Sequence, residues 1–163
     1  MTGGPLDMLL GTWAGPGRGF YPSIEPFEYT EEITFEAVPT KPFLAYRQRT
    51  RHATEGRPLH AESGYWRWVG EAEGGGTAVE VVLAHPTGVA EILEGVLRVG
   101  GPQQAELALR SRSVSLTSTA KDVRSTERLF HLEGDTLRYT FRMGAVGLPL
   151  QDHLEAALVR RAD

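Results

Sequence analysis

Hydrophobic and polar residues alternate at every second position over most of this chain. Residues 27–37 show the pattern most clearly, because rings and aliphatic groups at one set of positions (Phe27, Tyr29, Ile33, Phe35 and Ala37) alternate with polar residues at the other (Glu28, Thr30, Glu32, Thr34 and Glu36). In a β-strand, alternate side chains point to opposite faces, so this period places one set in a core and the other in water. The pattern therefore predicts a protein built from half-buried strands.

Further segments of strand composition are separated by clusters of Gly, Pro and Asp. The expected strands are residues 43–54, 59–69, 77–85, 89–99, 104–114, 123–133 and 136–145. Only residues 6–10 and 148–161 favour a helix. The second of these fits a final strand equally well, with Leu154, Ala156 and Leu158 on one face and His153 on the other. The short apolar run at 6–10 would suit a plug at one end of a barrel.

Many strands joined by short turns predict sequential antiparallel pairing, which either stacks as a sandwich or closes as an up-and-down barrel. We favour the barrel, because closure removes exposed strand edges and leaves room for one small ligand. The sequence thus predicts an all-β fold, a single compact antiparallel up-and-down β-barrel with a short N-terminal helical turn. It would form one domain over residues 1–163, with residues 1–5 flexible.

The amino-acid composition excludes several classes of binding partner. The chain has 163 residues, 40% of them hydrophobic, which suits one domain with a single core. A net charge of −4 without a run of Lys or Arg argues against nucleic acid or an anionic membrane surface as the principal partner. The absence of Cys excludes disulfides and thiolate chemistry. With no secretion signal and no apolar stretch long enough for a bilayer, we expect a cytoplasmic protein without a membrane partner.

Glycine alternates with other residues near the N-terminus. In a strand, Trp13, Gly15, Gly17 and Gly19 would share one face, as one large ring followed by three positions without side chains. Glycine weakens a strand interior, so this face predicts that something bulky approaches the backbone, either a packed neighbour or a flat ligand. The glycines precede Tyr21-Pro22 rather than a helix, so they form no phosphate-binding loop.

Most enzyme templates are missing. The chain has no nucleophile-elbow motif, and its strand carboxylates alternate outward, which predicts a solvated face. None of the five histidines lies two or four residues from another, so a zinc site built from sequence neighbours is not expected. We expect surface positions for His52, His60 and His131, and a place at the barrel rim for His85.

The fifth histidine, His153, lies between a Pro-containing loop and the apolar closing segment. Its position alone favours a half-buried imidazole hydrogen-bonded to the loop. A single histidine also suffices as the axial ligand of haem, because the porphyrin supplies the equatorial ligands. Both interpretations stay open on position alone.

Motifs at both ends of the chain resemble the nitrobindin family. The N-terminal one closely resembles the family signature, with Ser where Thr is usual, over Gly11-x-Trp13-x-Gly15-x-Gly17-x-Gly19-x-Tyr21-Pro22-Ser23-Ile24. Near the C-terminus, Pro149-Leu-Gln-Asp-His153-Leu is similar to the segment that carries the family's axial haem histidine. Residues 85–91 and 119–123 are similar as well, so the resemblance covers essentially the whole chain.

The resemblance implies a compact antiparallel barrel of about ten strands, similar to fatty-acid-binding proteins, with haem b near its mouth. His153 would be the proximal iron ligand and the catalytic centre, Ser23 a haem-contacting hydroxyl, and Lys121 a cation near the haem edge. A loop carbonyl or Asp152 would orient the imidazole of His153. The closing segment would be a strand.

The resemblance also implies an activity. One haem b per subunit, with an open sixth position, would bind nitric oxide and convert peroxynitrite to nitrate; no distal base is evident in the sequence. The expected partners are these small molecules, and a homodimer is compatible with the sequence. Two other classes of function fit the same barrel: a carrier of a fatty acid or other apolar molecule, and a structural or interaction module.

Overall fold

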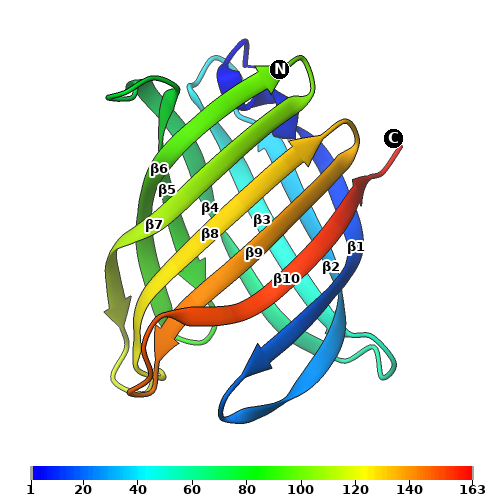
Figure 1. Cartoon of the computed structure of the whole chain (residues 1–163), viewed down its shortest axis with the longest axis vertical. Coiled ribbons are helices and arrows are strands. Elements are labelled where there is room, and N and C mark those ends of the chain that lie inside the picture. Colours follow the sequence, from blue (N-terminus) through cyan, green and yellow to red (C-terminus); the bar gives the residue numbers. More distant parts are fainter. Residues whose placement is uncertain (1, 163) are drawn as a thin grey trace.

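Ten antiparallel strands form a closed barrel in the computed structural model, which describes residues 2–162 (Figure 1). Each strand pairs with its neighbours in sequence, and the first and last strands pair with each other to close the sheet. The elements are the 3₁₀ turn η1 (Pro5–Leu9) and the strands β1 (Gly11–Tyr21), β2 (Ile24–Ala37), β3 (Phe43–His52), β4 (Pro58–Glu71), β5 (Thr77–His85), β6 (Val89–Gly101), β7 (Gln104–Leu116), β8 (Val123–Glu133), β9 (Thr136–Ala145) and β10 (Gln151–Arg160).

The predicted barrel is confirmed, and three predicted strands, β5, β8 and β9, have the expected bounds. Other boundaries were wrong by one to three residues. β3 ends at His52 because the chain turns there: the Gly56 N–H donates to the His52 carbonyl, and Gly56 has a φ of +69°. β4, β6 and β7 extend beyond their predicted ends, because their last residues still pair with a neighbouring strand.

The closing segment is the strand β10. It pairs with β9 on one side and β1 on the other, and it buries Ala156 and Leu158 in the core. The register shifts between Asp152 and Leu154, so simple alternation does not extend back to His153. The half-buried position predicted for the imidazole of His153 is confirmed, since its side chain is partly buried against the ring of Tyr21.

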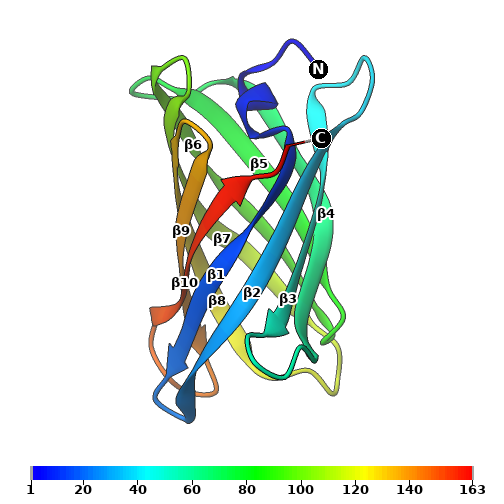
Figure 2. The same cartoon turned by 90° about the vertical axis from the view of Figure 1, so that its right-hand side faces the viewer.

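One end of the barrel is filled with apolar side chains and covered by η1 (Figure 2). Trp13 and Trp66 are completely buried there, and the Trp13 indole N–H donates to the Leu9 carbonyl at 2.8 Å. Leu6 and Leu9 of η1 belong to the same cluster. The apolar run at 6–10 therefore serves as the predicted plug.

The glycines of β1 make room for packed neighbours rather than for a ligand. A Cβ at Gly17 would overlap the ring of Tyr29, and one at Gly19 would overlap the ring of Phe27. Both rings come from β2, which pairs with β1 along this stretch. The bulky group that the glycine pattern predicted is therefore an aromatic side chain of the adjacent strand.

The N-terminal segment is tied to η1. The backbone N–H groups of Thr2 and Gly3 donate to the Asp7 carboxylate at 3.0 and 2.7 Å. Flexibility of residues 1–5 stays a prediction, and Met1 lies outside the described residues. Within residues 2–162, no helix has the length and hydropathy needed to cross a membrane.

We expect Gly15→Ala to destabilise the protein by about 1–3 kcal/mol, the usual cost of overpacking a filled interior. A Cβ at Gly15 would overlap the Ala157 carbonyl of β10, and strand backbone cannot move aside as a side chain can. Gly101→Ala is the matched control, because its Cβ would meet nothing closer than 3.8 Å. Urea unfolding of both variants measures the difference. Equal stability of the two would contradict close β1–β10 contact as the reason for Gly15.

Candidate functional site

Polar and charged side chains point into the barrel beyond the apolar cluster. Their common feature is that each lies in phase with the buried apolar residues of its own strand; they are Glu31, Gln48, Thr50, Glu62, Glu91, Thr126 and Arg128. The prediction that strand carboxylates face water is therefore wrong for Glu31, Glu62 and Glu91. The sequence does contain the signal, since an acidic residue at an inward position breaks the apolar alternation.

Arg128 holds two of these carboxylates. Its guanidinium donates to Glu62 Oε2 at 3.1 Å and to Glu91 Oε1 at 3.3 Å, and it lies 4.8 Å from the centre of the Phe141 ring. Burial by itself raises the pKa of Glu91, but the Arg128 charge and the hydrogen bonds from His85 and Thr126 together outweigh burial and lower the pKa to about 2. The pKa of Glu62 is likewise held well below its usual range despite burial. Both carboxylates are therefore ionised at neutral pH.

Glu31 has a different environment. Its carboxylate accepts hydrogen bonds from the Tyr139 hydroxyl at 2.7 Å and from Gln48 Nε2 at 2.6 Å, and within residues 2–162 it forms no salt bridge. Burial dominates and raises the pKa of Glu31 to about 7, although both hydrogen bonds favour the ionised form. Glu31 therefore changes charge near neutrality, whereas Glu91 does not.

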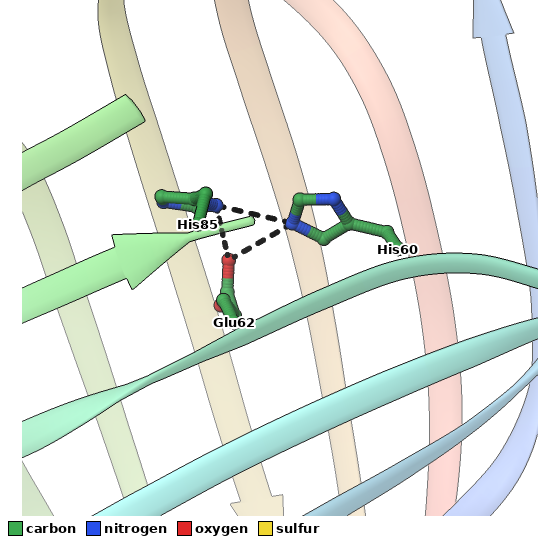
Figure 3. A group of neighbouring side chains, drawn as sticks. All are labelled: His60, Glu62 and His85. Atoms are coloured by element: carbon green, nitrogen blue, oxygen red, sulfur yellow. Dashed lines mark hydrogen bonds and ion pairs between the residues drawn. The ribbon is translucent and has the colours of Figure 1, made fainter. Parts of the chain in front are cut away.

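His60, Glu62 and His85 converge beside Arg128 (Figure 3). His60 Nε2 lies 3.1 Å from His85 Nδ1, and both nitrogens lie close to Glu62 Oε2. His85 is at the end of β5, the rim position predicted for it, but its ring is nearly buried and its Nε2 lies 2.6 Å from Glu91 Oε2. The surface position predicted for His60 is only partly right, because its side chain is one-third exposed.

The remaining histidines differ. His131 is exposed, as predicted, and its nearest acidic group is Glu106 at 3.5 Å. His52 is only partly exposed, and its Nδ1 accepts a hydrogen bond from the backbone N–H of Glu55 in the β3–β4 turn. Neither lies in the cluster of His60, Glu62 and His85.

His153 lies on β10, at the other side of the barrel from β4 and β5. Its Nδ1 is 2.9 Å from the Phe20 carbonyl of β1, and because a carbonyl only accepts, this nitrogen carries the proton. The rings of Tyr21 and Phe141 flank the imidazole, with centres 5.2 and 5.8 Å away. No hydrogen bond from Nε2 occurs within the described part of the chain, so its lone pair is available to a ligand.

The electrostatic surroundings of His153 favour the neutral ring. Burial lowers its pKa, and the charges of His60 and Lys121 lower it further, while the hydrogen bond to Phe20 acts in the opposite direction. A neutral imidazole with a bonded Nδ1–H is the form in which histidine binds a metal through Nε2.

The other predicted site residues lie at the strand ends near His153. Ser23 is exposed in the β1–β2 turn, and Lys121 is exposed between β7 and β8, close enough for its charge to act on His153. Asp152 does not orient the imidazole: it pairs with Arg142 at 3.3 Å, and the carbonyl that holds Nδ1 comes from a strand rather than a loop.

The raised pKa of Glu31 predicts a loss of stability as pH rises. Between the unfolded value near 4.3 and the folded value of about 7, the folded state holds a proton that the unfolded state has released, so stability falls through this window. From about pH 5 to about pH 7.5 we expect Glu31 to lower the free energy of unfolding by on the order of 2 kcal/mol. Urea unfolding at both pH values tests this.

Glu31→Gln should remove this pH-dependent part of the free energy of unfolding. The buried Gln48 Oε1, which has no hydrogen-bond partner within residues 2–162, can accept a hydrogen bond from the introduced amide. Glu28→Gln, an exposed change on the same strand, should keep the wild-type pH dependence. If Glu31→Gln showed the same fall in stability as the wild type, Glu31 would not be the titrating group.

Comparison with known proteins agrees with this geometry. Residues 3–160 match the family model described as the THAP4-like, heme-binding beta-barrel domain. Peroxynitrite isomerase 2 of Mycobacterium avium is 51% identical over 96% of this chain and 92% of its own length, and peroxynitrite isomerase 1 of Mycobacterium tuberculosis (strain H37Rv) is 48% identical over 96% and 93%. The crystal structure of Rv2717c from M. tuberculosis superposes with a TM-score of 0.88 and 48% identity, covering 96% of this chain and 95% of that one. This chain therefore belongs to the THAP4-like haem-binding β-barrel family, the nitrobindins.

Proposed function

We propose that this chain is a haem-dependent peroxynitrite isomerase in which Nε2 of His153 is the axial ligand of one haem b. The observation that carries the proposal is the hydrogen bond from His153 Nδ1 to the Phe20 carbonyl, because it leaves the Nε2 lone pair unprotonated. The proposal is supported by the names of relatives that are about half identical over nearly the whole chain.

The residues around His153 fit a haem. The porphyrin supplies four equatorial nitrogens, so one axial nitrogen is all the protein must provide. Tyr21 and Phe141 pack against the imidazole and limit its rotation. Tyr21 is itself held, since its hydroxyl is 3.1 Å from both the Met143 carbonyl and the Ala145 N–H. This set of contacts keeps the ligand nitrogen in one orientation.

Ferric haem, when bound, would supply an iron that acts as a Lewis acid in the rearrangement of peroxynitrite to nitrate. The chain's own part is to hold the imidazole neutral and oriented. In this proposal the Ser23 hydroxyl contacts the haem, and the Lys121 ammonium adds positive charge at the mouth, where it attracts anions. Nitric oxide is proposed as a second ligand on the family resemblance, and a cytoplasmic location and a homodimer stay predictions.

A carrier of fatty acids has less support. Four large side chains that are at most 1% exposed, Trp13, Trp66, Tyr29 and Phe35, occupy the interior. Other inward positions hold Arg128 and the carboxylates of Glu62 and Glu91. Separating these charges to admit an alkyl chain would cost free energy, because each charge would lose its buried partner. An apolar ligand would have to displace packed rings or lie on ionised groups.

We expect the full chain to take up one equivalent of haemin and to show the Soret band of histidine-bound ferric haem. His153→Ala should lose that band, because the variant lacks the imidazole that the Phe20 carbonyl orients. His131→Ala is the matched control, since His131 is an exposed residue of β8 whose imidazole faces Glu106. Absorption titration measures all three proteins. The same spectrum in His153→Ala and in the wild type would rule out His153 as the axial ligand.

The proposed isomerase activity is tested separately from haem binding. In stopped-flow measurements, peroxynitrite should decay faster with the haem-loaded wild type than with an equal concentration of free haemin, and nitrate should be the product. If decay were no faster than with free haemin, the isomerase proposal would fail even if haem binding through His153 were established.

A further inference from the structure

We propose that His60 Nε2, His85 Nδ1 and Glu62 Oε2 form a binding site for a divalent zinc-type ion, separate from His153. The two histidines and the carboxylate come from β4 and β5, on the wall of the barrel opposite β10 (Figure 3). This inference does not depend on the proposed haem function, because none of its three ligands is hydrogen-bonded to His153 or packed against its ring, although the charge of His60 acts on His153.

The spacing of the three ligand atoms matches tetrahedral coordination. Their separations are 3.1 Å for His60 Nε2 to His85 Nδ1, 3.3 Å for His85 Nδ1 to Glu62 Oε2, and 3.5 Å for His60 Nε2 to Glu62 Oε2. A tetrahedral ion with bonds of about 2.05 Å has its ligand atoms about 3.3 Å apart, whereas adjacent ligands of an octahedral ion at that bond length lie about 2.9 Å apart. The three atoms therefore already form one face of a zinc-sized tetrahedron.

The lone pairs are directed correctly. His85 Nε2 donates to the Glu91 carboxylate at 2.6 Å, so His85 Nδ1 is the unprotonated nitrogen. A carboxylate on the far nitrogen of a histidine is the arrangement that orients metal-bound imidazoles. With His85 Nδ1 as acceptor, His60 Nε2 carries the single proton between the two rings. A metal ion would take the place of that proton, which would move to His60 Nδ1 or to solvent.

The carboxylate is fixed as well. Glu62 Oε1 accepts a hydrogen bond from the buried Tyr46 hydroxyl at 2.8 Å, which leaves Oε2 facing the two imidazoles. Arg128 donates to Oε2 at 3.1 Å, but a carboxylate oxygen has a second lone pair for an ion. Arg128 offsets only one of the two buried negative charges of Glu62 and Glu91, so the cluster with neutral histidines has a net charge of −1. This surplus favours a cation.

The ligand chemistry selects the class of ion. Two imidazoles and one glutamate are a ligand set of zinc sites that keep a fourth position open for water, whereas Mg²⁺ and Ca²⁺ prefer all-oxygen sites. His60 is the one partly exposed member of the set, with one-third of its side chain accessible, so the ion can enter and exchange its fourth ligand from that side.

The test uses the full chain, stripped with a chelator and titrated with Co²⁺ and then Zn²⁺. We expect one equivalent of Co²⁺ to produce the intense visible absorption of tetrahedral cobalt and Zn²⁺ to abolish it. His60→Ala and Glu62→Gln should each weaken binding at least about 100-fold, and Glu91→Gln, which removes only the partner of a ligand, about 10- to 100-fold. Circular dichroism of each variant checks that the barrel is folded, and His60→Ala removes no completely buried side chain.

Two control variants separate this site from other histidines. His131→Ala should bind Co²⁺ as the wild type does, since His131 belongs to no cluster of three metal-binding side chains within residues 2–162. His153→Ala should also bind normally, whatever its effect on haemin. The proposal is overturned if stoichiometric Co²⁺ produces no tetrahedral spectrum, if folded His60→Ala binds as tightly as the wild type, or if His153→Ala abolishes binding.

Discussion

Pairing of β1 with β10 is the constraint on which the rest of this molecule depends. These strands join the two ends of the chain, Trp13 opposite Arg160 and Gly19 opposite Leu154, and so convert a ten-strand meander into a barrel. The same pairing brings the Phe20 carbonyl of β1 to the imidazole of His153 on β10. The orientation of the axial-ligand candidate is thus a consequence of closure rather than of any local motif around the histidine.

Closure also explains why the interior tolerates charge. A closed sheet encloses every inward side chain, so an inward carboxylate must find its partners among the other inward side chains. Arg128 on β8 does this for Glu62 on β4 and Glu91 on β6, and no two of these strands are adjacent in the sheet. Removing one member of such a network leaves another charge buried and uncompensated, which typically costs 3–5 kcal/mol. The network therefore links the walls of the barrel as well as lining it.

Period-two alternation was enough to predict the strands and their sequential pairing, because the alternating residues face either core or water whatever the long-range contacts. It was not enough for His153. The face on which its side chain lies depends on a register shift between Asp152 and Leu154, and no residue type in the segment predicts that shift. For β1, alternation correctly placed the glycines on one face, but the rings that occupy the space belong to Tyr29 and Phe27, and this required the β1–β2 register. Recognition of the family motif, rather than periodicity, made His153 the candidate axial ligand.

The cluster of His60, Glu62 and His85 shows why chain spacing is a poor guide to sites in a barrel. His60 and His85 are 25 residues apart, so a search for ligands two or four residues apart excludes them. In the sheet, β4 and β5 pair with Ser63 opposite Ala84, and this register places His85 beside the residues that precede Ser63. Glu62 could have been flagged from the sequence, since it shares the inward phase of Trp66. His85 likewise shares the inward phase of Val81 and Leu83. What the sequence could not predict is that the two imidazoles meet at Glu62, because this depends on the β4–β5 register.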